Sequence, residues 1–313
     1  MKQPTLAGLF LVLASLHFAW TGHSQSFTFQ RQDDGLLLNE QGKAVLFFQQ
    51  TPKSQDGKYS RSNYVHPLHD LDGKVLSEDF PADHLHHRGV FWAWHEILVG
   101  GNKIGDAWDC NNISWNVQRV KGSTNGETAA LTTRTFWESM LTDQDPKPTK
   151  IFKEKTRIDV YPSTAFYRVI DFTIKLKPLL KDMAIGGSTD SKGYGGFSPR
   201  IKLPEDLKFW GEMGEVIPQT NGIEAGPWID MLGSFNDNEV SGVAIMMHPE
   251  YPAAPQKWIL RAKGSMQNAA FPGNQAFAMK KGKWLELRYR MVIHRKEIGK
   301  DIISKLYYEF ISK

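Results

Sequence analysis

The stretch LELRYRMVIH at residues 285–294 decides the fold class, because its apolar side chains alternate with charged ones. A period of two residues is typical of a β-strand that buries one face. Comparable short runs lie at residues 45–50, 90–99, 113–120, 129–137, 151–161, 166–176 and 242–248. Turn-forming pairs separate the runs, namely Asp72-Gly73, Lys121-Gly122, Asn125-Gly126, Asn221-Gly222 and Lys281-Gly282. Many short strands at this spacing predict an all-β sandwich or barrel and disfavour βαβ units.

One helix is predicted, near the C-terminus. Ile298, Ile302, Leu306 and Phe310 recur every four residues, which places them on one face of a helix. Asp301 lies in the first turn, where a negative charge complements the helix dipole. We expect this C-terminal helix to pack against the sheet.

The first residues have the pattern of an export signal. Lys2 gives the positive start, residues 6–16 form an uncharged apolar core, and Gly22-His23-Ser24 offers a cleavage site. We expect a signal peptide over residues 1–24 and a single β-sandwich domain over residues 25–313, exported to the periplasm or the extracellular space. The apolar run is shorter than the roughly 20 residues of a membrane-spanning helix, so stable membrane insertion is not expected.

Charge and cysteine content argue against a nucleic-acid-binding protein and against a disulfide-bonded one. A net charge of +4 over 313 residues is too small to indicate a nucleic-acid partner, and no cluster of Lys and Arg forms a basic patch. Cys110 is the single cysteine, so no intramolecular disulfide is expected. Its sequence neighbours offer no paired base, and we expect Cys110 to be a buried small residue.

The densest cluster of ionisable side chains is the segment DHLHHRG at residues 83–89. Three of the ten histidines fall there, and histidine suits both proton transfer near neutral pH and metal binding. If the segment is extended, His84, His86 and Arg88 share one face, while His87 faces the other way. The planar guanidinium of Arg88 can hold a carboxylate or a sugar hydroxyl. We therefore expect the functional site at this segment.

The histidine segment is compatible with two kinds of site. Without a metal, one of the three histidines is the general acid or base, Arg88 anchors the substrate, and no cofactor is needed. With a metal, His84 and His86 bind one ion, and Asp106 or His248 supplies a third ligand.

Aromatic residues close to the histidines are candidate substrate contacts. The chain has 10 tryptophans, and Trp92, Trp94 and Trp108 follow the histidine segment. Indole rings stack on the apolar faces of sugars and donate a hydrogen bond, which suits these residues and His95 to a sugar ligand. Core packing is the alternative for each tryptophan.

Three further candidates lie downstream. The segment GYGGFSPR at residues 193–200 is rich in glycine and lacks the spacing of a phosphate-binding loop. It predicts a tight approach of the backbone to a substrate or to another strand, with Arg200 directed into the site. Asp230 lies close to Trp228, and His248 ends a strand, a place where binding residues often occur.

Taken together, these motifs resemble the PmoA-like family of uncharacterised bacterial proteins (DUF6807). The matching motifs are YVHPL at 64–68, DG at 72–73, DFP at 79–81, HLHHRG at 84–89, DAW at 106–108, GGF at 195–197 with Arg200, WID at 228–230, HP at 248–249 and YP at 251–252. The resemblance implies a large antiparallel β-sandwich of the mutarotase-like (supersandwich) type and a sugar-derived ligand. The family label also suggests an oxygenase subunit, although no segment after the signal is long enough to span a membrane.

Three functions remain open at this point. The first is an exported carbohydrate-active enzyme that uses a histidine for proton transfer in hydrolysis, elimination or epimerisation, with Asp106, Asp230 and His248 completing the site. No motif places the pair of acids that ordinary glycoside hydrolysis needs. The second is a non-catalytic carbohydrate-binding protein, and the third is a metal-dependent oxygenase or metal-binding protein.

Overall fold

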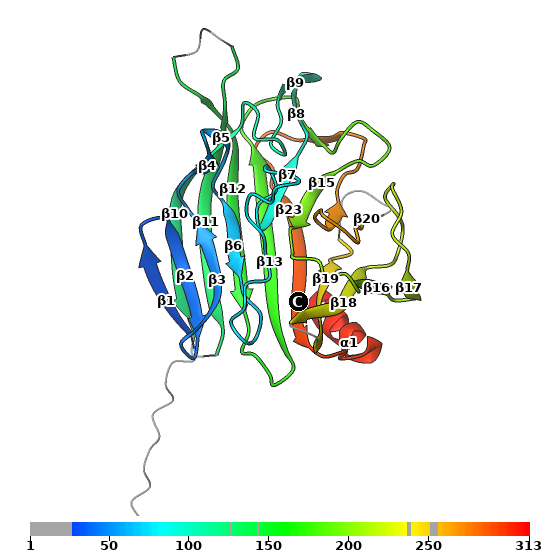
Figure 1. Ribbon diagram of the computed structural model, residues 1–313. Coiled ribbons are helices and arrows are strands. Elements are labelled where there is room, and N and C mark those ends of the chain that lie inside the picture. The colour runs from blue at the N-terminus through cyan, green and yellow to red at the C-terminus, as the bar shows by residue number, and fades with distance from the viewer. Residues whose placement is uncertain (1–26, 126, 143, 145, 237–238, 251–255) are drawn as a thin grey trace, which may run out of the picture.

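Strands dominate the computed structural model, which describes residues 27–125, 127–142, 144, 146–236, 239–250 and 256–313 (Figure 1). The signal peptide predicted over residues 1–24 lies outside these described residues. Two large antiparallel sheets face one another, and one helix, α1, lies near the C-terminus. The predicted large antiparallel β-sandwich with a C-terminal helix is confirmed.

Among the described residues, the first sheet has eight strands. In spatial order they are β1 (Phe27–Gln32), β2 (Gly35–Glu40), β3 (Lys43–Gln49), β6 (Tyr64–Leu68), β7 (Val90–Trp94), β15 (Gly195–Pro199), β21 (Asn268–Ala270) and β20 (Lys257–Ile259). Because β6 and β7 are neighbours, the connection over residues 69–89 leaves β6 and returns beside it. The histidine segment forms the end of this connection.

The second sheet has nine strands in the part of the chain that the structure describes. They are β10 (Ser114–Thr124), β11 (Ala129–Ser139), β12 (Thr149–Val160), β13 (Tyr167–Pro178), β23 (Leu285–Arg295), β19 (Glu239–Met247), β18 (Trp228–Asn236), β16 (Lys208–Gly211) and β17 (Gly214–Val216). Long neighbouring strands such as β12 and β13 pair without a break from Phe152 to Val160. This sheet forms the wall behind the first sheet in Figure 1.

Two small sheets account for the other described strands. One contains β22 (Phe277–Met279), β14 (Met183–Gly186), β8 (Glu96–Val99) and β9 (Asn102–Gly105), and the other pairs β4 (Lys53–Gln55) with β5 (Lys58–Arg61). The single strand predicted over residues 90–99 therefore divides at His95. Strand β7 belongs to the large first sheet and β8 to a small one, so His95 lies at the point where the chain changes sheets.

Aromatic side chains fill the space between the two large sheets. Trp94 of β7 lies beside Trp137 of β11, with ring centroids 5.8 Å apart, and Phe197 of β15 stacks on Tyr289 of β23 at 4.4 Å. All four belong to one continuous core. Burial of each large side chain stabilises the fold by about 2–3 kcal/mol, which explains part of the high tryptophan content.

Strand β23 contains the alternating stretch on which the fold class rests. Its odd-numbered residues from Leu285 to Ile293 are buried and Glu286 is exposed, so the half-buried pattern is confirmed in the first half of the strand. The second half is buried on both faces, because α1 covers its outer face. Arg290 on that face is 2% exposed and donates to the Asp171 carboxylate and the Leu306 carbonyl.

Helix α1 (Lys300–Ile311) lies where the sequence predicts it. Leu306 and Phe310 are buried against the outer face of the second sheet, as expected. Ile302 is 40% exposed, so its predicted burial is wrong, and Ile303 takes the inner position in its place. No helix among the described residues is long and apolar enough to cross a membrane.

Two glycines allow strands to approach closely. Gly122 lies inside β10, so the turn predicted at Lys121-Gly122 is wrong; a Cβ there would lie 2.3 Å from the Phe29 ring of β1. Gly196 of β15 has a φ of +97°, and a Cβ there would lie 2.9 Å from the Ala269 carbonyl oxygen of β21. The glycine-rich segment thus serves the approach of neighbouring strands, one of the two interpretations of its sequence.

Candidate functional site

The histidine segment is a turn, and its predicted extended conformation is wrong. The His84 amide donates to the Pro81 carbonyl at 3.0 Å, and the His87 amide donates to the His84 carbonyl at 2.9 Å. The turn brings together rings that strict alternation would separate. His84 stacks on His87 with ring centroids 4.6 Å apart, and His86 meets His87 edge-on at 4.5 Å. The three imidazoles, here called the histidine turn, therefore lie together in one cluster.

Burial keeps two of these imidazoles neutral at physiological pH. Burial lowers the pKa of His86 to about 4, and the nearby Asp109 carboxylate offsets only part of this effect. Burial, reinforced by the neighbouring His86 and His84, lowers the pKa of His87 to about 2. A neutral imidazole has one ring nitrogen with a free lone pair, so His86, with 21% of its side chain exposed, can accept a hydrogen bond from a ligand.

Arg200 joins the histidine turn from β15, as its sequence position suggests. Its guanidinium donates to Glu78 and Asp83, both at 2.7 Å, and its Nη1 lies 3.4 Å from His87 Nδ1. Since Arg200 can only donate, this contact makes His87 Nδ1 the acceptor. The Arg200 amide also donates to the Gly89 carbonyl at 2.6 Å. Arg200 is only 3% exposed, so it fixes the position of the histidine turn.

Arg88 lies away from the ligand-accessible surface. Its side chain is fully buried and makes four hydrogen bonds, to Asp79, Tyr64 and the carbonyls of Lys53 and Tyr59. Burial of a guanidinium needs this many acceptors, because each unpaired donor would cost free energy. Arg88 therefore supports the β4–β5 hairpin and is too buried to bind a ligand, contrary to its predicted role.

Trp92 and Trp94 point into the sandwich core and not into the site. Both are 2% exposed or less. The Trp92 indole donates to the Glu154 carboxylate at 3.0 Å, and the Trp94 indole donates to the Phe271 carbonyl at 2.8 Å. Their predicted contact with substrate does not fit this placement, because the inner face of β7 packs against the second sheet.

The opposite face of β7 carries the site. Phe91 contacts both His87 and Trp108, with ring centroids 6.2 Å and 5.3 Å apart. Trp108 is the hub of the aromatic contacts: it stacks on His95 at 5.2 Å and meets His87 edge-on at 5.9 Å. The fifth ring is that of Tyr194, 5.7 Å from Trp108. His87 and His95 therefore both contact Trp108, although the turn and strand β7 separate them in the chain.

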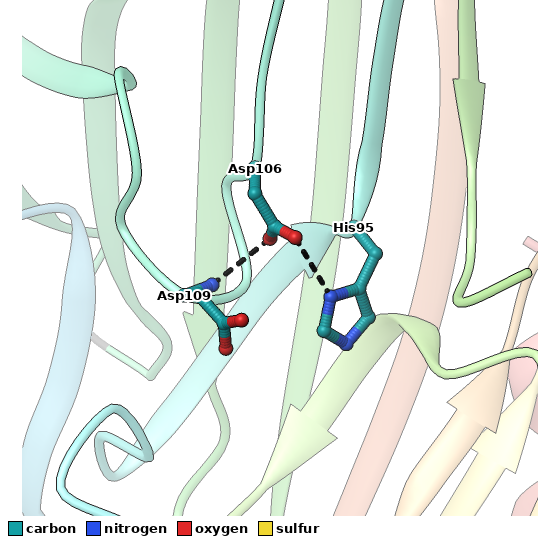
Figure 2. Close-up of side chains that lie close together, drawn as sticks. All are labelled: His95, Asp106 and Asp109. Atoms are coloured by element: carbon teal, nitrogen blue, oxygen red, sulfur yellow. Dashed lines mark hydrogen bonds and ion pairs between the residues drawn. The ribbon is translucent and has the colours of Figure 1, made fainter. Parts of the chain in front are cut away.

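Asp106 holds His95 in a fixed orientation, as Figure 2 shows. His95 Nδ1 donates to Asp106 Oδ2 at 3.0 Å, which leaves His95 Nε2 as the nitrogen that can meet a ligand. Asp106 also accepts from the amides of Trp108 and Asp109 and from Lys103. These donors lower the pKa of Asp106 against the opposing effect of burial, so it stays a carboxylate.

A second carboxylate and histidine lie beside this pair. Asp109 Oδ1 is 3.7 Å from His86 Nε2, and about half of the Asp109 side chain is exposed. His95, Asp106 and Asp109 also place one ligand atom each within 4.8 Å of one another, so these three residues could hold a metal ion. This set differs from the predicted His84 and His86 pair. Lys103 is 3.1 Å from Asp106 Oδ2, and its positive charge opposes a cation there.

Asp230 and His248 lie elsewhere in the fold. Asp230 of β18 accepts from His294 of β23 at 2.9 Å within the second sheet. His248 lies 3.0 Å from Arg288 and 5.5 Å from the Phe310 ring of α1. Among the described contacts, neither residue touches the histidine turn, so their predicted place in the same site is not supported by the geometry.

The Asp230–His294 pair makes the stability of the protein depend on pH. His294 donates from both ring nitrogens, to Asp230 and to the Lys296 carbonyl, and Asp230 raises the pKa of His294 despite its burial. Below the ordinary histidine pKa of 6.5 this protonation stabilises the fold, and the contribution is lost as pH rises through the folded-state pKa. We expect urea unfolding to show falling stability across that range. The Asp230→Asn variant should show a flatter profile, and an equal slope in both proteins would contradict the assignment.

Four residues of the site were missed in the sequence. Asp109 and Tyr194 lie close in the sequence to the candidate residues Trp108 and Arg200, and this proximity is the only signal for them. Lys103 has no such signal. Arg61 is 1% exposed, and its guanidinium donates to the carbonyls of Ala107 and Trp108, which fixes the loop that carries Asp106 to Asp109.

Comparisons with known proteins identify the family and little beyond it. A model described as a family of unknown function (DUF6807) matches residues 36–308. Among solved structures, the chain is similar to a GH36 α-galactosidase from Geobacillus stearothermophilus in complex with raffinose, at 9% identity and a TM-score of 0.41. The match covers 87% of this chain and 41% of that chain, so this chain spans less than half of its length. A search of curated proteins finds no match.

Proposed function

The chain belongs to the DUF6807 family, whose function is unknown, and from that starting point we propose that it is an exported carbohydrate-active enzyme that transfers protons through His95. The observation that carries the proposal is the Asp106–His95 pair beside the histidine turn. A carboxylate that holds one imidazole nitrogen directs the other toward a ligand and stabilises the imidazolium that forms on proton transfer.

The arrangement favours elimination or epimerisation over ordinary glycoside hydrolysis. His95 Nε2 takes a proton from the sugar, and the resulting imidazolium returns it to the leaving oxygen or to carbon. His86, which stays neutral because burial lowers its pKa to about 4, can accept a hydrogen bond from the ligand beside Asp109. Asp106 and Asp109 come from one loop, and Asp106 is already occupied by four donors, so the two acids do not flank a ligand from opposite sides.

A sugar ligand is supported by the aromatic surroundings of the pair. Tyr194 is partly exposed and is the ring that a ligand can contact, because Trp108, which adjoins it and stacks on His95, is only 3% exposed. Aromatic rings bind the apolar faces of sugars, while Asp109 and Lys103 on the same surface can bind hydroxyl groups. The motif resemblance to the PmoA-like family implies a mutarotase-like sandwich, a fold type that handles carbohydrates, and this implication points to the same substrate class.

The test is a screen of monosaccharides and oligosaccharides in which ultraviolet absorbance and mass spectrometry detect unsaturated products and NMR detects epimers. On the substrate it identifies, we expect His95→Gln and Asp106→Asn each to lower kcat by about 100-fold or more, with binding retained. The control is His69→Gln, which replaces a half-buried histidine bonded to the Gly73 carbonyl outside the site. Unchanged kcat in His95→Gln would overturn the proposal, and so would ligand binding by the wild type without any product.

A metal-dependent protein, the function that the PmoA-like label suggests, is the second candidate. The proximity of His95, Asp106 and Asp109 favours it, since two carboxylates and an imidazole suit a divalent transition metal. Elemental analysis of protein purified without chelator separates the two candidates. The proton-transfer proposal expects no stoichiometric metal and full turnover in the presence of chelator.

A further inference from the structure

A cavity of 330 Å³ is lined in part by Lys192, whose ammonium lies 5.8 Å from the centre of the Tyr194 ring of the candidate site. Its walls come from the loop before β15 and the loop between β21 and β22, which are joined by a hydrogen bond from the Gly187 amide to the Gly273 carbonyl at 2.9 Å. Its lining residues are Ser191, Lys192, Lys257, Ala270, Pro272, Gly273, Asn274, Gln275, Ala276 and Phe277. The volume is within the range of small-molecule binding sites.

The charge of this cavity is one-sided. Lys192 and Lys257 contribute two ammonium groups, and no acidic residue is among those that line it. Asp190, outside the lining, forms an ion pair with Lys192 at 3.5 Å, so an anionic ligand has to displace or share this carboxylate at Lys192. The amides of Asn274 and Gln275 add uncharged hydrogen-bond donors. Cations and amide donors are the groups that bind an anionic substituent, and no lining residue is acidic.

Tyr194 connects the cavity to the proton-transfer site. Its ring lies 5.8 Å from the Lys192 ammonium on one side and 5.7 Å from the Trp108 ring on the other. Arg261 fixes the tyrosine by donating to its hydroxyl at 2.6 Å. Trp108 in turn stacks on His95, so a continuous row of groups leads from Lys192 to His95.

We propose that the cavity binds the acidic substituent, a carboxylate or a sulfate ester, of a sugar ligand whose reacting part lies at His95. This inference rests on the proposed function and adds the substrate class, namely oligosaccharides that contain uronic acid or sulfated sugar. The acidic group is held by Lys192 and Lys257 and takes no part in proton transfer. Tyr194 lies beneath the part of the ligand that joins the acidic group to the reacting part.

Calorimetry with three probes tests the proposal: trigalacturonic acid, galactose 6-sulfate and the neutral galactotriose. We expect at least one acidic probe to bind at least tenfold more tightly than galactotriose, with affinity that falls as salt rises. Lys192→Met and Lys257→Met should each weaken acidic-probe binding roughly fivefold, the size expected for one partly exposed ion pair. Lys305→Met on α1 is the matched control, because its ammonium is exposed on another face, and its affinity should equal that of the wild type.

Equal binding of acidic and neutral probes, absence of binding by both acidic probes, or unaltered affinity in both cavity variants would overturn the subsite. The same titrations on His95→Gln separate this failure from failure of the proposed function. If acidic probes still bind to His95→Gln and the wild type forms no product, the catalytic role is contradicted and the subsite is supported. If the protein turns over neutral sugars and this turnover depends on His95 but not on Lys192 or Lys257, the subsite is contradicted and the catalytic role is supported.

Discussion

Replacement of Glu154 by leucine is expected to lower the free energy of unfolding by about 4 kcal/mol, because it removes the acceptor of several buried donors. Glu154 is fully buried between the sheets, and its carboxylate accepts from Trp137 at 2.7 Å, Trp92 at 3.0 Å, Asn63 at 3.0 Å and Thr156 at 2.7 Å. Leucine leaves two indole N–H groups and an amide without partners in a dry core. Each such orphaned donor costs about 1–3 kcal/mol.

Glutamine at the same position should be much less harmful. Its carbonyl oxygen can accept from both indoles, and its amide can donate to the Thr156 hydroxyl, which is able to accept. Burial raises the pKa of Glu154, so the protein already disfavours the full charge that glutamine lacks. We expect Glu154→Gln to cost about 1 kcal/mol or less.

Urea unfolding of the two variants provides the measurement, with Glu286→Leu as the control on the neighbouring surface. Glu286 pairs with Lys175, and both side chains are 42% exposed, so its loss should cost no more than about 0.5 kcal/mol. If Glu154→Leu is as stable as the wild type, or if Glu154→Gln is equally damaging, the buried acceptor is not what stabilises this part of the core.

Replacement of Gly89 by alanine is expected to destabilise the fold by about 3 kcal/mol or more. Gly89 has a φ of +39°, and a Cβ there would lie 2.0 Å from the Val65 carbonyl oxygen and 2.7 Å from the His66 Cβ. The first contact is with backbone, so it is relieved only if β6 and β7 separate. That movement would also displace the histidine turn and Arg200, whose amide donates to the Gly89 carbonyl.

Gly73→Ala separates steric overlap from backbone strain. Gly73 also has a positive φ, +87°, but a Cβ there would meet no atom within 4 Å. Its replacement should cost about 1–2 kcal/mol, the strain of a left-handed residue alone. Thermal and urea unfolding give the stabilities, and histidine NMR signals report the turn. Equal losses in the two variants, or unmoved histidine signals in Gly89→Ala, would contradict this account.

The candidate site was only partly visible in the sequence. The structure brings Asp106, His95, Trp108 and Arg200 close to the dense histidine segment, as their motifs predicted. Arg88 is held in a buried network by Asp79 and Tyr64, which no local pattern reveals. The tryptophans of β7 turn into the core, because the strand has a sheet on one side and the site on the other.

What the sequence by itself determined is the class of fold and the position of several of its longer strands and of its C-terminal helix. Alternation along residues 285–294, turn-forming pairs between short runs and a four-residue repeat before the C-terminus depend on neighbours in the chain, so they could be read directly. The tertiary structure alone decided that α1 covers half of β23, that the histidines form a turn, and that His248 and Asp230 lie apart from it. These outcomes depend on contacts between residues far apart in sequence, such as Arg200 with Asp83 and Asp171 with Arg290. Packing of one sheet against another sets those contacts, and local periodicity carries no information about them.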